Sequence, residues 1–455
     1  MMDIKGKRVL VAGLGKSGMA MLSALNGTGA AVTVCDDKRR DSFGQEAIDR
    51  LERSGADCRF GGWPREDEEF DVLLLSPGIP PALEFVRTAA QRGAEVIGEL
   101  EFAYRRGKGK HVAITGTNGK TTTTSLVGAM FREAGLDARV VGNIGIPVTS
   151  VTGDVNDESW LITEVSSFQL ETIKDFRPLV SAILNMTPDH LDRHGTMESY
   201  MRAKANVFMN QKEGDRFVMN LDDPAVVGLS RSCKARVVPF SRKGELACGA
   251  FMKGGAISVR GDDGALTALC GAGDLLMPGA HNLENALAAA AISFFAGVDP
   301  AAIAVALRTF PGVEHRLEFV GEVHGVRFVN DSKGTNPDAS AKAVEAIDGD
   351  IVLIAGGYDK KSDFGGLIGS FRGKVKHMAL LGATAEAIRE AASAAGFSNC
   401  VILKDMEECV GEAFALAGPG DTVLLSPACA SWDMYGSFEE RGADFKECVR
   451  RLEGV

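Results

Sequence analysis

The loop from Gly116 to Thr121 contains the residue types that hold phosphate groups. It follows a short β-prone run and leads into a predicted helix, so its backbone N–H groups converge where the helix N-terminus adds partial positive charge. Lys120 can reach the outer phosphates, and the Thr121 hydroxyl can bind Mg²⁺. Ile114 stands where the common P-loop has its first glycine, so this loop is shorter than usual. The pattern predicts a nucleotide-binding protein from a family whose phosphate loop is shorter than the common P-loop. A glycine-rich turn without a ligand is the alternative.

Acidic and histidine side chains follow two further predicted strands. An apolar run ends on Glu164, which we expect near Thr121 as a second Mg²⁺ ligand beside a triphosphate. A turn or helix-capping carboxylate is the alternative. The segment Asp189–His194 holds two aspartates and two histidines, which favours a metal or substrate role, and its oxygen ligands favour Mg²⁺ over zinc. Lys204 lies on a predicted helix and, from the sequence alone, is a solvated lysine.

Two glycine-rich turns near the N-terminus could hold a nucleotide. Gly13, Gly15 and Gly18 have the shape of the G-x-G-x-x-G loop, and Asp36 follows at about 20 residues, where a carboxylate would bind a ribose. The turn Ser76–Gly78 offers a second backbone anion site. A nicotinamide dinucleotide, a uridine diphosphate and no ligand at all remain three interpretations of these turns.

Further polar side chains stand in the second half of the chain. Asn282 and Asn285 share one helix face and could contact a nucleotide, or serve as an N-cap and a surface amide. Arg316 could clamp a phosphate in the bidentate way. Asp, Ser, Lys and Thr stand close together in Asp331–Thr335 after another predicted strand, and further loops offer Lys360 and Ser431. Together they suit a small dicarboxylate, although each loop alone could be ordinary turn chemistry.

The elements that must position these residues repeat one pattern, an apolar strand followed by glycines and a helix, beginning at Arg8, His111 and Ile351. This alternation predicts parallel sheets with helices on both faces and ligands at the carboxyl ends of the strands. We expect Arg236–Leu269 to form a small antiparallel flap. The fold class is therefore α/β, with three domains: a Rossmann-like one at 1–107, a P-loop-type ATPase with a mostly parallel sheet at 108–312, and a second Rossmann-like one at 313–455.

The composition excludes several classes of protein. The chain has 455 residues and a formal net charge of −11, without a basic face, so we expect no nucleic-acid partner. The longest apolar stretch, near Ala286–Gly297, is too short to span a bilayer, and the N-terminus lacks the apolar core of a signal peptide. Nine scattered cysteines without metal spacing fit reduced thiols. We therefore expect a cytoplasmic protein without a membrane partner, and a monomer.

Taken together, the motifs resemble those of the Mur ligase family over nearly the whole chain. The resemblance rests on Gly116–Thr121, Gly142–Gly145, Glu164–Glu171, Asp189–His194, His281–Asn285, Glu314–Arg316, Asp331–Asn336 and Ser426–Ser431.

The resemblance implies an ATP-dependent acid–D-amino-acid ligase of peptidoglycan precursor synthesis, most similar to members that add D-glutamate to UDP-N-acetylmuramoyl-L-alanine. A substrate carboxylate would attack the γ-phosphate of ATP, and the amino group would then displace phosphate from the acyl phosphate. The implied cofactors are ATP, two Mg²⁺ ions and a carbamate on Lys204.

The resemblance also implies roles for individual residues. The catalytic residues would be Lys120, Glu164, His190, Lys204 and Arg316. ATP would contact Gly116, Thr117, Asn118, Gly119, Lys120, Thr121, Thr122, Asn282, Asn285, Arg316 and Asp331, and the metal ligands would be Thr121, Glu164, His190 and Lys204. The UDP substrate would contact Gly15, Lys16, Ser17, Asp36, Asp37, Ser76, Pro77, Gly78, Asn143 and His190, and the amino acid Thr335, Lys360, Ser431 and Phe438.

The sequence differs from the family's usual motifs at a few positions, and other functions remain as alternatives. Gly334 stands where the family more often has alanine, and Tyr358-Asp359 replaces a smaller pair beside Lys360. The rivals within the family add L-alanine, a diamino acid or a dipeptide, and folylpolyglutamate synthases are more distant. The chain lacks the Asp-Asn-Pro-Arg motif of the diamino-acid ligases. A nicotinamide dehydrogenase and a regulatory nucleotide-binding module are the rivals from other classes.

Overall fold

A computed structural model describes residues 2–65, 67–277, 279–358 and 362–453. The chain is α/β and builds three sheets, as predicted. It divides into two compact units, one of residues 1–272 and 284–308 and the other of residues 273–283 and 309–455. None of the helices in the described ranges combines the length and apolar character that a bilayer crossing requires.

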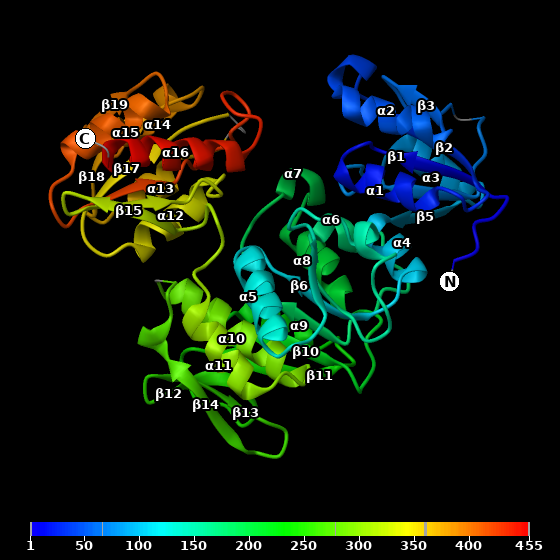
Figure 1. Cartoon of the computed structure of the whole chain (residues 1–455), viewed down its shortest axis with the longest axis horizontal. Helices are drawn as coiled ribbons and strands as arrows, with labels where there is room; N and C mark the ends of the chain where they lie inside the picture. The colour runs from blue at the N-terminus through cyan, green and yellow to red at the C-terminus, as the bar shows by residue number, and fades with distance from the viewer. Residues whose placement is uncertain (1, 66, 278, 359–361, 454–455) are drawn as a thin grey trace. The chain divides into compact units, whose positions relative to one another are not determined.

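The first sheet is fully parallel, with strand order β3-β2-β1-β4-β5 (Figure 1). Buried side chains of α1, α2 and α4 form a core with one face of the sheet, and those of α3 with the other. The order steps outward in both directions from between β1 and β4, which is where open α/β sheets bind ligands. The elements are β1 (Arg8–Ala12), α1 (Lys16–Leu25), β2 (Ala31–Asp36), α2 (Gln45–Ser54), β3 (Asp57–Phe60), β4 (Val72–Leu75), α3 (Glu84–Gln91), β5 (Glu95–Gly98) and α4 (Glu99–Arg106).

The second sheet has nine strands in the order β14-β13-β12-β11-β10-β9-β6-β8-β7. Its elements are β6 (Lys110–Thr115), α5 (Lys120–Glu133), β7 (Ala138–Gly142), η2 (Val148–Val151), β8 (Trp160–Glu164), α6 (Ser167–Leu170), β9 (Val180–Ile183), α7 (Leu191–His194), α8 (Met197–Ala205), β10 (Arg216–Asn220), α9 (Pro224–Ser230), β11 (Arg236–Ser241), β12 (Gly249–Lys253), β13 (Ala256–Arg260), β14 (Leu266–Gly271), α10 (Ala280–Phe295) and α11 (Pro300–Thr309).

The predicted flap is partly wrong. Strands β12, β13 and β14 are antiparallel, but β11 pairs in parallel with β10 and β12, so the ribbon continues the main sheet. Sequence alternation cannot distinguish these arrangements, because either ladder places alternate side chains on opposite faces.

Helix α4 carries two buried carboxylates that accept hydrogen bonds from backbone N–H groups in segments around the second sheet. Glu101 accepts N–H groups of the segment Lys174–Phe176 at 2.9–3.0 Å, and a Glu99 oxygen accepts the Thr149 N–H at 2.7 Å. Both glutamates are at most 1% exposed. Helix α4 is therefore anchored at two points beyond its own sheet.

The second unit has a six-stranded sheet in the order β15-β16-β20-β17-β18-β19, parallel except for the edge hairpin β15–β16. Side chains of α12, α13 and α14 pack on one face, and those of α15 and α16 on the other. The elements are β15 (Glu318–Val323), β16 (Val326–Asn330), α12 (Pro337–Ala346), β17 (Ile351–Ala355), α13 (Gly365–Gly369), β18 (Val375–Leu380), α14 (Ala385–Ala394), β19 (Cys400–Ile402), α15 (Met406–Leu416), β20 (Thr422–Leu425) and α16 (Phe438–Glu453).

Candidate active site

The loop Gly116–Gly119 joins β6 to α5 at the carboxyl edge of the second sheet. Gly119 has φ +83°, and a Cβ there would lie 2.2 Å from Oδ1 of Asn285. Gly116 has φ +145° and lies against the backbone of Leu184. Only glycine fits both positions without strain, so the loop packs as closely as a phosphate cradle requires.

Asn185, which follows β9, holds this loop in place. Its carbonyl accepts the Thr117 N–H at 3.0 Å, and its side chain both accepts the Asn118 N–H at 2.8 Å and donates to the Asn118 carbonyl at 3.0 Å. The Thr117 hydroxyl lies 3.2 Å from the Tyr200 hydroxyl. The loop is therefore preorganised by the neighbouring strand end.

Lys120 opens α5 and folds over its own loop, because its Nζ donates to the carbonyls of Gly116 and Thr117 at 3.0 and 2.8 Å. The next two side chains, Thr121 and Thr122, lie buried in the first turn of the helix. This arrangement holds the Lys120 ammonium against the backbone of the loop.

Lys204 is not solvated, so the expectation drawn from the sequence alone is wrong. Thr196 caps helix α8, and Lys204 near the end of that helix is 2% exposed. Its Nζ donates to the Gly116 carbonyl at 2.8 Å and to the Thr115 hydroxyl at 3.3 Å. Burial, reinforced by the like charge of Lys120, holds the pKa of Lys204 well below that of an ordinary lysine.

Glu164 ends β8 and is 2% exposed. One oxygen, Oε1, accepts the Asn143 side-chain amide at 2.9 Å, and the Asn143 N–H binds the Glu164 carbonyl at 2.9 Å. The other oxygen, Oε2, is buried without a hydrogen-bond partner within the described ranges. A buried carboxylate oxygen without a donor is costly unless a cation or a proton satisfies it.

His190 has φ +51° and is half exposed at the start of α7. Its Nε2 lies 3.5 Å from the Asp189 carboxylate, and its ring packs edge-on against Phe168 of α6 at 4.9 Å between centroids. Asp189 and Glu164 both act electrostatically on Lys204. The structure thus gathers Lys120, Glu164, Asp189 and Lys204 at one edge of the sheet, with His190 attached through Asp189.

The first sheet brings its two predicted turns together. The Ser76 hydroxyl donates to the Gly13 carbonyl at 2.7 Å, and the Asp36 carboxylate accepts the Leu14 and Lys38 N–H groups at 2.7 and 3.0 Å. Asp36 is buried, so in this structure it shapes the turn. The other predicted UDP contacts, Gly15, Lys16, Ser17, Asp37, Pro77 and Gly78, are exposed or partly exposed around these turns.

Arg193 of α7 links this region to the second sheet. Its guanidinium donates to the carbonyls of Pro77 and Gly78 at 3.2 and 3.3 Å, pairs with Glu171 at 2.7 Å and covers the ring of Phe168. The side chain is only 14% exposed. The motif Asp189–His194 contains Arg193 but gives no sign of this role.

In the second unit, Asp331 follows β16 and is wholly buried. Its carboxylate accepts the Ser426 hydroxyl at 2.7 Å and the Leu317 N–H at 3.3 Å, and Arg316 lies within electrostatic range. Burial raises the pKa of Asp331 to about 6, against the opposing effects of these partners. Asp331 and Arg316, predicted as nucleotide contacts, therefore lie in one neighbourhood.

The predicted amino-acid contacts of this unit gather at the carboxyl ends of β16 and β20. Thr335 follows β16, Ser431 follows β20, and the backbone carbonyl of Phe438 accepts the Ser332 hydroxyl at 2.8 Å. The Lys333 ammonium lies 5.3 Å from the centre of the Phe438 ring. Lys360 lies outside the described residues.

Helix α10 carries the two predicted asparagines, and both are buried. The helix begins in the second unit, with Asn282, and continues in the first, with Asn285. Asn285 accepts the Thr123 hydroxyl at 3.4 Å, next to the phosphate loop.

The sequence of this chain was compared with those of known protein families. Three family models match the chain: the Mur ligase MurD-like N-terminal domain at residues 7–98, the Mur ligase middle domain at 114–293 and the Mur ligase glutamate ligase domain at 315–429. The chain belongs to the Mur ligase family. Among its relatives are the UDP-N-acetylmuramoylalanine–D-glutamate ligases of Thermoanaerobacter sp. (strain X514), 48% identical, and Clostridioides difficile (strain 630), 46% identical, each aligned over 99% of this chain and 100% of the relative.

Solved structures of the family share the fold. The UDP-N-acetylmuramate-alanine ligase MurC of Thermotoga maritima superposes with a TM-score of 0.61 at 19% identity, over 98% of this chain and 99% of that one. MurF ligase from the same organism, in complex with ADP, gives 0.57 at 18% identity, over 86% of this chain and 97% of that one.

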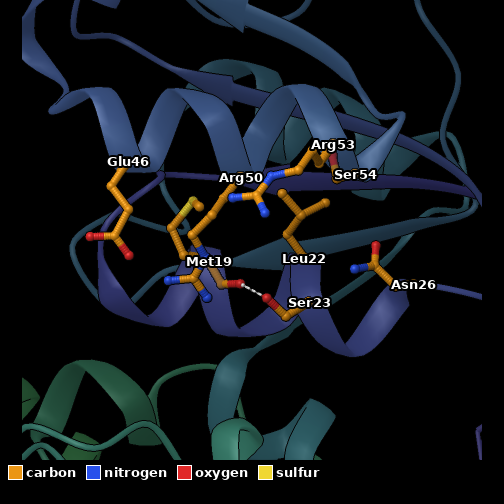
Figure 2. A pocket seen from close by; sticks show the side chains of 8 residues that line it. All are labelled: Met19, Leu22, Ser23, Asn26, Glu46, Arg50, Arg53 and Ser54. Atoms are coloured by element: carbon orange, nitrogen blue, oxygen red, sulfur yellow. Dashed lines mark hydrogen bonds between the residues drawn. The ribbon is translucent and has the colours of Figure 1, made fainter.

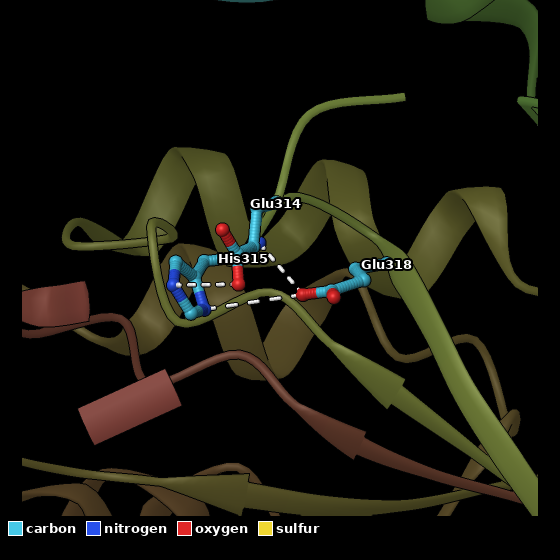
Figure 3. Close-up of side chains that lie close together, drawn as sticks. All are labelled: Glu314, His315 and Glu318. Atoms are coloured by element: carbon cyan, nitrogen blue, oxygen red, sulfur yellow. Dashed lines mark hydrogen bonds and ion pairs between the residues drawn. The ribbon is translucent and has the colours of Figure 1, made fainter. Parts of the chain in front are cut away.

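One acidic cluster in this Mur ligase has the residue types of a metal site. Glu314, His315 and Glu318 are the one group of three such ligands found close together in the part of the chain that the structure describes (Figure 3). The ammonium of Lys446 pairs with both carboxylates. One ammonium therefore offsets part of the negative charge of the two carboxylates.

A polar hollow of about 370 Å³ lies between α1 and α2 of this Mur ligase (Figure 2). Arg50, Arg53 and Ser23 contribute to its lining, and Ser23 also donates to the Met19 carbonyl of its own helix at 2.9 Å. It contains none of the predicted site residues and lies along the helices rather than at the carboxyl edge of the sheet.

Asn185 and Tyr200, which hold the phosphate loop, are two functional residues that the sequence did not predict. A signal was present for Asn185, since it directly follows a predicted strand whose end should lie beside that loop. Tyr200 had no such signal, because a helical tyrosine near a hydrophobic core is ordinary.

Proposed function

We propose that this Mur ligase joins D-glutamate to UDP-N-acetylmuramoyl-L-alanine with the hydrolysis of ATP to ADP and phosphate, a step of peptidoglycan precursor synthesis. The observation that carries this proposal is the 46–48% identity, over 99% of the chain, to ligases of that name. The protein is an enzyme, and the residues described above support the following steps for its reaction.

The phosphate loop supplies the first half of the reaction. The substrate carboxylate attacks the γ-phosphorus of ATP, the bond to the β-γ bridging oxygen breaks, and an acyl phosphate and ADP result. The loop N–H groups, Lys120 and Arg316 are proposed to balance the phosphoryl charge, which is most of what phosphoryl transfer requires from a protein. The proposed ATP contacts are Gly116–Thr122, Asn282, Asn285, Arg316 and Asp331.

The residues at this edge fit a divalent cation. Glu164 offers a buried oxygen without a donor, and Asp189 adds a second carboxylate to the neighbourhood. Oxygen ligands of this kind suit Mg²⁺. We propose Thr121, Glu164, His190 and Lys204 as the residues that would hold two Mg²⁺ ions. When bound, Mg²⁺ would neutralise charge on the phosphate oxygens.

We propose that Lys204 is carbamylated. Its low pKa leaves the amine unprotonated more often than that of an exposed lysine, and only the neutral amine can react with CO₂. The nitrogen lone pair forms the N–C bond while one C=O π bond of CO₂ breaks and its electron pair moves to oxygen, and one proton leaves the nitrogen. The product is an anion, which removes the repulsion between Lys204 and Lys120 and adds an oxygen ligand.

The two organic substrates would use the other two sheets. We propose that the turns at Gly15–Ser17, Asp36–Asp37 and Ser76–Gly78 hold the uridine diphosphate, with Asn143 and His190 toward the carboxylate to be activated. D-glutamate would contact Thr335, Lys360, Ser431 and Phe438. Its amino group displaces phosphate through a tetrahedral intermediate. The corresponding domains are proposed at 1–107, 108–312 and 313–455.

We place the enzyme in the cytoplasm, as a monomer without nucleic-acid or membrane partners. None of the nine cysteines, all within the described residues, forms a disulfide, which suits a reducing compartment. Its nucleotide substrates are themselves intracellular compounds. Size-exclusion chromatography with light scattering checks the monomer.

A phosphate-release assay tests the proposed function. Release should require ATP, UDP-N-acetylmuramoyl-L-alanine and D-glutamate together, and Lys120→Ala should abolish it while the far-UV circular dichroism stays unchanged. Lys212→Ala, at an exposed lysine, is the matched control and should retain activity. Equal release with L-alanine or L-lysine in place of D-glutamate would refute the assigned specificity.

A further inference from the structure

Arg441 of α16 is the largest fully buried side chain in the described part of the chain, at 1% exposure. Its Nε donates to the Ser332 hydroxyl at 3.0 Å, and Nη2 donates to the Ser332 carbonyl at 2.8 Å. The same guanidinium donates to the carbonyls of Cys429 and Ala430 at 3.1 and 3.2 Å. One side chain therefore ties two separate loops together.

These loops follow neighbouring strands of the sheet. Ser332 follows β16, and Cys429 and Ala430 follow β20, which pairs with β16 on one side and β17 on the other. The loop after β17 is equally close, since a Cβ on Gly357 would lie 3.1 Å from Nη1 of Arg441. The guanidinium thus lies among the loops of three adjacent strands, at the carboxyl edge where parallel sheets bind ligands.

Among the described residues, the charge of Arg441 has no directly bound counterion. All four hydrogen-bond acceptors are neutral oxygens, and no carboxylate among the described residues forms an ion pair with it. Burial lowers its pKa to about 10, so the side chain stays charged at neutral pH. Asp433 and Asp331 act on it only at longer range. Burying a cation that has only neutral acceptors is costly. The negative charge of a ligand bound in the neighbouring loops would offset part of that cost.

We propose that Arg441 is a positioning residue for the acidic amino-acid substrate: it fixes the loops that carry Thr335 and Ser431 and contributes positive potential that favours a dicarboxylate. This inference rests on the proposed function. Arg441 would not touch the substrate, and its loss would weaken the binding of the acidic amino acid but not that of ATP or the UDP precursor. Lys333, also after β16, adds a second cation to the same region.

The test compares Arg441→Met, which removes the charge, with Arg441→Lys, which keeps the charge but not the planar fork. Arg450→Met, at an exposed arginine of the same helix, is the control. Arg441→Met should raise KM for D-glutamate at least tenfold and leave KM for ATP and for the UDP precursor within about twofold. Arg441→Lys should raise it less.

Ser332→Ala provides a milder variant should Arg441→Met fail to fold. It removes only the hydroxyl that links Arg441 to the Phe438 carbonyl, so KM for D-glutamate should rise severalfold while the protein stays folded with a melting temperature lowered by a few degrees at most. Uniform increases in all three KM values, or a loss confined to kcat, would overturn the inference. If the wild-type enzyme itself releases no phosphate with D-glutamate, the proposed function fails instead, and the two outcomes are thereby separated.

Discussion

Nζ of Lys204 lies 2.8 Å from the carbonyl oxygen of Gly116, so an amine from α8 holds the first residue of the phosphate loop. Tyr200, one turn earlier on the same helix, holds the loop at Thr117, and its ring lies 4.8 Å from Nζ of Lys204. Helix α8 therefore acts on the loop through two side chains. Chemical change at Lys204 is transmitted directly to the phosphate site.

Lys204→Ala is expected to reduce phosphate release by about a hundredfold or more, because it removes the proposed carbamate and its ligand oxygens. Short carboxylic acids such as acetate or propionate should restore part of the activity, since the truncated side chain leaves room for a carboxylate. The rates are measured with and without added acid, and the wild type serves as the control. If the acid restores nothing while the variant remains folded, carbamylation is contradicted.

Asp331→Asn should change how stability depends on pH. The pKa of Asp331 is about 6 in the folded chain and 3.8 in the reference state, so between these values the folded protein binds the extra proton. Stability from this group is complete below pH 3.8 and is lost as the pH rises to 6, by at most about 3 kcal/mol. Urea unfolding of both proteins from pH 4 to 7 should show the free energy of unfolding of the wild type falling relative to that of the variant up to about pH 6 and then levelling; a constant difference would exclude the raised pKa.

Arg193→Met should weaken binding of the UDP precursor, because the carbonyls of Pro77 and Gly78 lose their donor. Loss of a charged hydrogen bond corresponds to roughly a tenfold rise in KM for that substrate. Arg202→Met, at an exposed arginine of α8, is the matched control. Glu171→Gln should have a similar effect, and the double variant should be less than additive because the two residues are paired. Full additivity would indicate that they act separately.

Two glycines of the first turn should respond differently to alanine. A Cβ on Gly18 would lie 1.8 Å from the Gly13 carbonyl, so Gly18→Ala should destabilise the protein by about 2 kcal/mol or more. Gly15 has φ −70° and open space around its Cβ, so Gly15→Ala should change stability by at most about 0.5 kcal/mol. If Gly15 faces the diphosphate, its variant should nevertheless raise KM for the UDP precursor. Thermal unfolding and initial rates measure the two effects.

The sequence predicted the α/β class and the position of the phosphate loop because those features are local. A strand, a glycine turn and a helix N-terminus all fall within about a dozen residues around Gly116. The parallel pairing of β11 was missed, because pairing depends on which distant strand is adjacent. Likewise, nothing near Lys204 in the sequence distinguishes a buried amine from a solvated one; its burial follows from the packing of α8 under the phosphate loop.

Buried charges were the hardest feature to foresee. Glu99 and Glu101 start a helix, where acidic residues are usual and generally exposed. Arg441 lies in a polar stretch near the C-terminus. Nothing in that stretch indicates that its hydrogen-bond acceptors are in the loop of Cys429, more than ten residues earlier, and in the loop of Ser332, more than a hundred residues earlier. Such residues become visible only once the fold has brought their partners together.

The anchoring of α4 has a consequence for how this chain may be divided. A fragment that ended after α4 would expose Glu101 without the three amides of Lys174–Phe176, and the remainder would keep those amides without an acceptor. Each piece would carry broken charge-assisted hydrogen bonds, so neither is a self-sufficient folding module. Heat should therefore melt the first sheet together with the second, and proteases that cut near Gly107 should leave the two pieces associated.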